Sequence, residues 1–125
     1  MKRLIAAAVL TLLVVAALVT DILVTNKVVE VLTVDINNCK SAAEQGDYKL
    51  AEQYAEEIER NWQKIESYYS PFINHNLIDD MGVSVSKLKP LAKTQNNMYL
   101  TECRVIEVTL THIKNDSRFS LHNIL

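Results

Sequence analysis

One short stretch of the chain gathers side chains of the kinds that bind metals or move protons. In SPFINHNLIDD, residues 70–80, His75 is followed four residues later by Asp79, with Asp80 next to it. If a helix begins after Pro71, His75 and Asp79 lie on one face of it, within hydrogen-bonding or ion-pairing reach. Two such groups make half of a metal site or an acid–base pair. His75 and Asp79 are therefore the candidate metal ligands of this sequence.

A polar corner between two helices is the alternative for this stretch. Catalytic zinc takes three protein ligands and structural zinc four, and Asp80 would point about 100° away from Asp79 on a helix. In this interpretation Asn74 or Asn76 caps the helix that follows, and the aspartates favour its positive N-terminal end. Capping needs no missing ligand, so we prefer it and expect His75 to bond to Asp79 as a structural contact.

The two cysteines, Cys39 and Cys103, each fall on an apolar stripe of a predicted helix. If those helices are neighbours in an oxidising compartment, a disulfide would join them and stabilise the fold by about 2–4 kcal/mol. The alternative is two reduced cysteines that serve as small core residues. Because the sequence does not set the distance between them, both interpretations stay open.

Signatures of common enzyme and nucleic-acid-binding classes are absent from the sequence. Two glycines cannot form a phosphate-binding glycine-rich loop, and neither Gly-x-Ser-x-Gly nor His-Glu-x-x-His occurs. The net charge is −2, and no cluster of Lys and Arg alternates with aromatic residues, as nucleic-acid binding would require. We expect no catalytic residue, no cofactor and no nucleic-acid partner.

The N-terminus has the pattern of a membrane segment. Two basic residues precede an apolar run that carries no charge from Leu4 to Val19. Continued to Val24, a helix over residues 4–24 is roughly 31 Å long, which matches the hydrocarbon core of a bilayer. These residues are expected to contact lipid.

The flanks of this run predict how it is used. No Ala-x-Ala cleavage pattern occurs at its end, so we predict that residues 1–24 form an uncleaved signal anchor. Lys2 and Arg3 place the N-terminus in the cytoplasm and the remainder of the chain outside it. Secretion after cleavage of a signal peptide is the alternative.

Apolar residues at three–four spacing predict helices in the remainder of the chain. Eight successive positions mark one buried stripe: Tyr48, Ala51, Ala55, Ile58, Trp62, Ile65, Tyr69 and Phe72. We assign Trp62 and Phe72 a structural role in the core.

The same spacing recurs before and after this stripe. It predicts helices near 25–45, 47–70, 77–93 and 97–115, followed by a C-terminal tail. Because the connections are short, neighbouring helices should be antiparallel. The expected fold is all-α: one N-terminal transmembrane helix that continues into a small up-down bundle formed by residues 25–125.

The chain as a whole resembles a known family. GDYKLAEQYAEEIERNWQKIE, FINHNLIDDMGVSVSKLKPL and the ending FSLHNIL are similar to the uncharacterised bacterial family of short, membrane-anchored helical proteins called domain-of-unknown-function family 4363. The distinctive parts are Trp62, the Phe72-x-x-His75 step, Ile78-Asp79, the Ser-x-Leu run from Ser86 to Leu88 and the terminal Asn123-Ile124-Leu125. The resemblance implies an exported helical domain and no established activity or ligand. The chain has Leu77 where the family typically has Glu.

We therefore predict a membrane-tethered, extracytoplasmic interaction or scaffold module of the bacterial envelope, with a protein partner of unknown identity. The alternative is a metal- or small-ligand-binding sensor domain centred on His75 and Asp79. The tail RFSLHNIL is either a docking element or, as we expect, a segment that folds back over the open end of the bundle.

Overall fold

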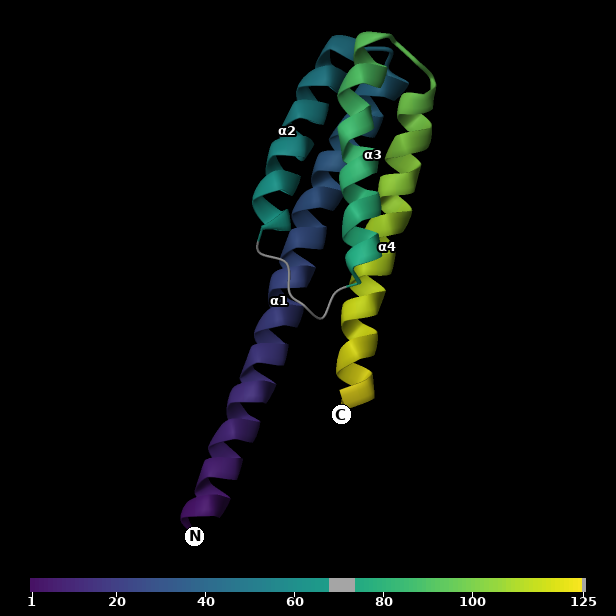
Figure 1. Cartoon of the computed structure of the whole chain (residues 1–125). Coiled ribbons are helices and arrows are strands. Elements are labelled where there is room, and N and C mark those ends of the chain that lie inside the picture. The colour runs from purple at the N-terminus through teal and green to yellow at the C-terminus, as the bar shows by residue number, and fades with distance from the viewer. Residues whose placement is uncertain (68–73, 125) are drawn as a thin grey trace.

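Four helices packed side by side form the protein, as a computed structural model of the chain shows (Figure 1). The structure describes residues 1–67 and 74–124, the last eight of these as backbone alone. The helices are α1 (Lys2–Glu44), α2 (Tyr48–Glu66), α3 (His75–Lys93) and α4 (Met98–Ile124). Each packs against the next in sequence, and α4 packs against α1, so that the bundle closes. The predicted all-α, up-down fold is confirmed.

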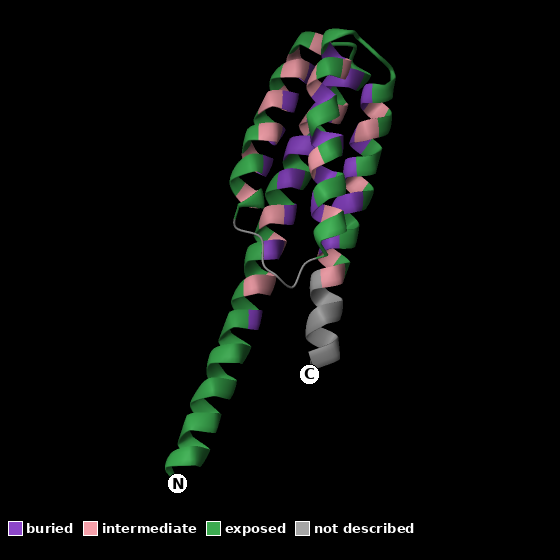
Figure 2. Ribbon diagram, in the orientation of Figure 1, coloured by how far each residue is buried: buried purple, intermediate pink, exposed green. Residues whose placement is uncertain are grey.

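The first helix is about twice as long as α2 or α3. Its 43 residues span roughly 65 Å without a break, and the N-terminal part stands outside the bundle (Figure 1). There the apolar side chains face outward, with Leu4 76% and Leu13 62% exposed (Figure 2). The prediction that the apolar segment continues into the bundle as one helix is confirmed.

The core lies where the three–four spacing predicts it. Fully or almost fully buried side chains come from every helix: Leu32, Ile36 and Cys39; Ala55, Ile58 and Trp62; Met81, Val85 and Leu88; Tyr99, Cys103 and Ile106. Each set repeats at intervals of three or four residues, so one stripe per helix faces the bundle axis. Tyr69 and Phe72, the last two residues of the stripe predicted for α2, lie outside the described residues.

Local chemistry explains the turns at the end of the bundle far from the N-terminus. Gly46 adopts a left-handed φ of 74°, and Asp47 caps α2 by accepting a 3.1 Å hydrogen bond from the Leu50 N–H. Between α3 and α4, Gln95 takes the left-handed conformation instead, with φ 51°. Pro90 lies within α3, which continues to Lys93.

Helix boundaries differ from the predicted ones by more than one residue at three ends. α3 begins at His75, two residues before its predicted start. α2 ends at Glu66, four residues before its predicted end. α4 continues to Ile124 where we predicted an end near 115 and a tail that folds back. No Gly or Pro occurs after Pro90, so nothing in the sequence of α4 stops a helix.

Candidate functional site

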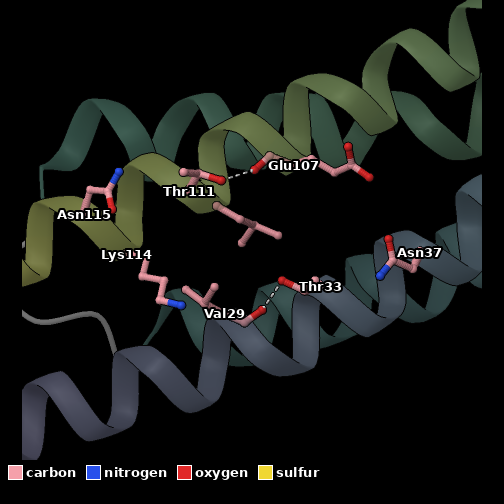
Figure 3. Close-up of a pocket in the computed structure, with 8 residues that line it drawn as sticks. Val29, Thr33, Asn37, Glu107, Thr111, Lys114 and Asn115 are labelled. Atoms are coloured by element: carbon pink, nitrogen blue, oxygen red, sulfur yellow. Dashed lines mark hydrogen bonds between the residues drawn. The ribbon is translucent and has the colours of Figure 1, made fainter.

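A polar groove lies between the facing sides of α1 and α4, at the end of the bundle near the apolar segment (Figure 3). Its volume is about 390 Å³. Eight residues line it: Val29, Thr33, Asn37, Glu107, Leu110, Thr111, Lys114 and Asn115. They recur at steps of three or four along each helix, beside the buried stripe, so the groove follows the edge of the core.

Several polar groups of the groove are already bonded within the protein. The Thr33 hydroxyl donates to the Val29 carbonyl oxygen at 2.6 Å, and the Thr111 hydroxyl donates to that of Glu107 at 3.1 Å. The Glu107 carboxylate accepts hydrogen bonds from Lys40 at 3.2 Å and Arg104 at 3.1 Å. Partial burial raises the pKa of Glu107, but these bonds outweigh that effect and leave it below its ordinary value.

Lys114 supplies a positive charge to the groove. Among the side chains that the structure describes, no carboxylate forms an ion pair with it, and Figure 3 shows its ammonium group reaching from α4 toward Val29 on α1. Asn37 and Asn115 also line the groove. This arrangement suits binding of a group rich in hydrogen-bond acceptors.

The stretch around His75 forms the start of α3. Asn74 is the N-cap, and its side-chain oxygen accepts a 2.9 Å hydrogen bond from the Asn76 N–H, as one of our two capping assignments predicted. His75 and Asp79 are both exposed. Over residues 1–67 and 74–116, neither a hydrogen bond nor an ion pair joins His75 to Asp79, so the expected contact is absent there.

A residue that the sequence analysis did not select completes this corner. The Asp116 carboxylate on α4 accepts a 3.2 Å hydrogen bond from the backbone N–H of Asn74. Asp116 and His112, one turn apart on α4, line a shallow pocket with Asn74 and Leu77. Because we expected Asp116 to lie in a tail beyond the last helix, no periodic signal marked it.

The metal hypothesis finds no third ligand in this part of the fold. No group of three or more His, Cys, Asp or Glu side chains within the described residues could hold a metal ion. His75 and Asp79 therefore stay a two-residue prediction.

Cys39 and Cys103 lie in the core on the neighbouring helices α1 and α4, fully buried as free thiols. Burial raises the pKa of Cys39 to about 11 and of Cys103 to about 12. Tyr99 shares this layer: its ring is fully buried, and its hydroxyl donates to the Ala51 carbonyl oxygen at 2.8 Å. The thiols are thus protonated and shielded from solvent, and a disulfide between them stays a prediction.

Trp62 is 2% exposed and packs between α2 and α3. A methyl group at Gly82 would lie 3.3 Å from its indole nitrogen, so the glycine leaves room for the ring to approach α3. This contact gives both residues a packing role.

Comparison with known proteins identifies a family. The model of a domain of unknown function, DUF4363, matches residues 20–124, which include the whole bundle and the end of the apolar segment. No curated protein and no solved structure matches the chain.

Proposed function

The chain belongs to the DUF4363 family, and from that membership and the structure we propose that it is a membrane-tethered, extracytoplasmic helical module that binds a protein partner or acts as a scaffold in the bacterial envelope. The chain has one helix, within its described residues, that is long and apolar enough to cross a membrane. That helix, α1, also supplies one wall of the bundle.

The exposed apolar segment at the start of α1 is the main support for this proposal. Leu10, Leu12 and Leu13 are each more than 60% exposed, while Leu32 and Ile36 further along the same helix are completely buried. Each exposed square ångström of apolar surface costs about 25 cal/mol in water. Insertion of residues 4–24 into a bilayer removes that cost along the whole segment.

The state of the two buried thiols and of Glu107 favours a binding role over catalysis. Among the described residues, the thiols of Cys39 and Cys103 have raised pKa values and are sealed in the core. The Glu107 carboxylate is held as an anion by two cations. None of these groups is both accessible and poised to exchange a proton near neutral pH, as an acid–base catalyst would be. We therefore propose that the protein is not an enzyme.

Fractionation of cells that express the full chain tests the tether. We expect the protein in the membrane pellet after alkaline carbonate extraction, with an intact N-terminal peptide by mass spectrometry. A phosphatase fused after Leu125 should be active, because that enzyme matures only outside the cytoplasm. A soluble exported chain that lacks the apolar segment would favour the cleaved-signal alternative, and an inactive fusion would overturn the topology.

The groove between α1 and α4 is the first surface to test for a partner. A photo-crosslinking amino acid at Asn37, which lines the groove, should join the chain to a discrete protein in living cells. The same amino acid at Gln53, exposed on α2, is the matched control. Equal labelling from both positions, or none from Asn37, would remove the groove as the binding surface.

A further inference from the structure

The C-terminal end of α4 projects beyond the rest of the bundle. The hydrogen bond from the Asn74 N–H to Asp116 sets the first residue of α3 level with Asp116. α4 continues for eight residues after that, to Ile124, which adds roughly 12 Å. In Figure 1 this end of α4 points the same way as the N-terminal part of α1.

An ion pair and two residues that line the same groove indicate how far along α1 this end reaches. Lys40 on α1 pairs with Glu107 on α4 at 3.2 Å. Since both helices rise about 1.5 Å per residue and run antiparallel, counting 17 residues from this pair brings Ile124 level with Leu23. Val29 and Lys114 line the same groove, and counting from them brings Ile124 level with Val19. Both levels fall within the last turns of the segment 4–24.

The burial of α1 residues near this level independently supports this register between α1 and α4. Leu18 is 8% and Thr25 4% exposed, although Leu13 and Leu23 on the same helix are 62% and 64% exposed. Leu18 and Thr25 continue, at helical spacing, the stripe of Val29 and Leu32 that faces the bundle. The buried stripe of α1 thus extends to the part of that helix that lies level with the end of α4.

The sequence of this end fits a bilayer surface. Residues 117–125, SRFSLHNIL, contain Phe119, Leu121, Ile124 and one arginine, and no acidic residue. Apolar side chains of this kind bury at the boundary of headgroups and acyl chains, while arginine reaches lipid phosphates.

We propose that the last two turns of α4 lie in the membrane–water interface beside α1 and form a second contact with the lipid bilayer. Lipid covers the side of these two turns that faces away from the bundle. The bundle then stands on the membrane through two helices, with its turns at residues 45–47 and 94–97 farthest from the surface. This inference rests on the proposed tether, since it takes residues 4–24 to be in the bilayer.

Fluorescence quenching in vesicles tests the proposal on the full chain. Leu121, Val14 and Asn96 are replaced one at a time by the fluorescent residue dansylalanine, and each protein is reconstituted into phosphatidylcholine–phosphatidylglycerol vesicles. A fraction of the phosphatidylcholine carries a doxyl quencher near the headgroup or deep in the acyl chain. Asn96 is the control, because it lies in the turn farthest from the membrane.

We expect shallow doxyl lipid to quench position 121 several-fold more than position 96, and deep doxyl lipid to quench position 14. If position 14 is quenched but 121 matches 96, the second contact is overturned and the tether stands. Loss of quenching at position 14 would overturn both. If the emission at position 121 is blue-shifted but unquenched, protein covers the segment and the proposal is overturned. A blue shift that reverses when the protein is diluted in lipid shows that a second copy covers it. A blue shift that persists shows that the same chain covers it.

Discussion

The side-chain amide of Asn61 on α2 donates a 2.7 Å hydrogen bond to the carboxylate of Asp35 on α1. Asp35 is only 9% exposed, so this bond places a charged group at the edge of an otherwise apolar interface. A buried carboxylate without a hydrogen-bond donor costs free energy. A shift of α2 along α1 would break the bond from Asn61 and leave the Asp35 carboxylate without this donor. The pair therefore fixes the relative position of the two helices.

Removal of the donor tests this assignment. Asn61→Ala leaves the Asp35 carboxylate without this hydrogen bond, and we expect the free energy of unfolding to fall by about 1–3 kcal/mol. Chemical denaturation in detergent micelles measures it. Asn37→Ala, on the exposed side of α1, is the control and should change stability little. A loss in Asn61→Ala no larger than in the control would show that the pair does not fix the interface.

Tyr99 reaches across the bundle from α4 to the Ala51 carbonyl oxygen on α2, a helix that is not its neighbour in sequence. Tyr99→Phe keeps the buried ring and removes the hydroxyl, so we expect a loss of about 1 kcal/mol, the typical value of one such bond. Tyr54→Phe is the matched control, because that ring is half-buried and its hydroxyl has no hydrogen bond among the residues described. Equal thermal stability of the two variants would contradict a structural role for the Tyr99 hydroxyl.

A residue's role in this fold could be predicted from the sequence where it follows from helical periodicity. It could not be predicted where it depends on a contact with one residue of another helix. Ile58, Trp62 and Leu88 recur at helical spacing, and burial of a whole stripe is what drives helices together, so the bundle was predictable. Asp35, Asn61 and Asp116 act through a single partner on another helix. No local pattern encodes such a pairing, and each became visible only with the packing known.

The stretch around His75 shows the same division. Asn74 was predictable as a cap because capping is local, decided by residues within one turn. The contact that we expected from His75 to Asp79 is geometrically allowed at that spacing. Both side chains are exposed, however, and water competes with exposed pairs, which contribute little.

Alkaline pH should destabilise the bundle through its buried thiols. The pKa of Cys39 is raised to about 11 and that of Cys103 to about 12 by burial, whereas an unfolded thiol titrates near 8.5. Between these values the unfolded chain releases protons that the folded chain retains. Stability is therefore unaffected below about pH 8 and falls as pH rises toward 11, by up to about 1.4 kcal/mol per pH unit for each thiol.

Thermal melts followed by circular dichroism from pH 7 to pH 11 measure this dependence. In Cys39→Ala/Cys103→Ala the decline above pH 9 should be shallower, whatever the absolute stability of the variant. Tyr99, whose pKa burial also raises, accounts for part of the remaining slope. An unchanged slope in the double variant would contradict the role of the thiols.

Zinc should leave the melting temperature of the full chain unchanged. His75 and Asp79 are exposed at the start of α3, and two ligands fall short of the three or four that zinc sites use. A rise in melting temperature with added zinc that disappears in His75→Ala would favour the sensor hypothesis over the interaction module. A rise that persists in His75→Ala would place the zinc elsewhere in the chain.

Truncation of α4 should separate the stability of the bundle from its contact with lipid. The Asp116 carboxylate on α4 bonds to the start of α3, so a chain that ends at Phe119 keeps this capping contact and the core from Tyr99 to Ile113. In detergent micelles we expect its melting temperature to stay close to that of the full chain. In vesicles the truncated chain should lose protection of α1 near Thr25 in hydrogen–deuterium exchange, because the segment beside that turn is gone. A large fall in melting temperature in micelles would instead make residues 120–125 part of the bundle's own packing, as a tail folded over its open end would be.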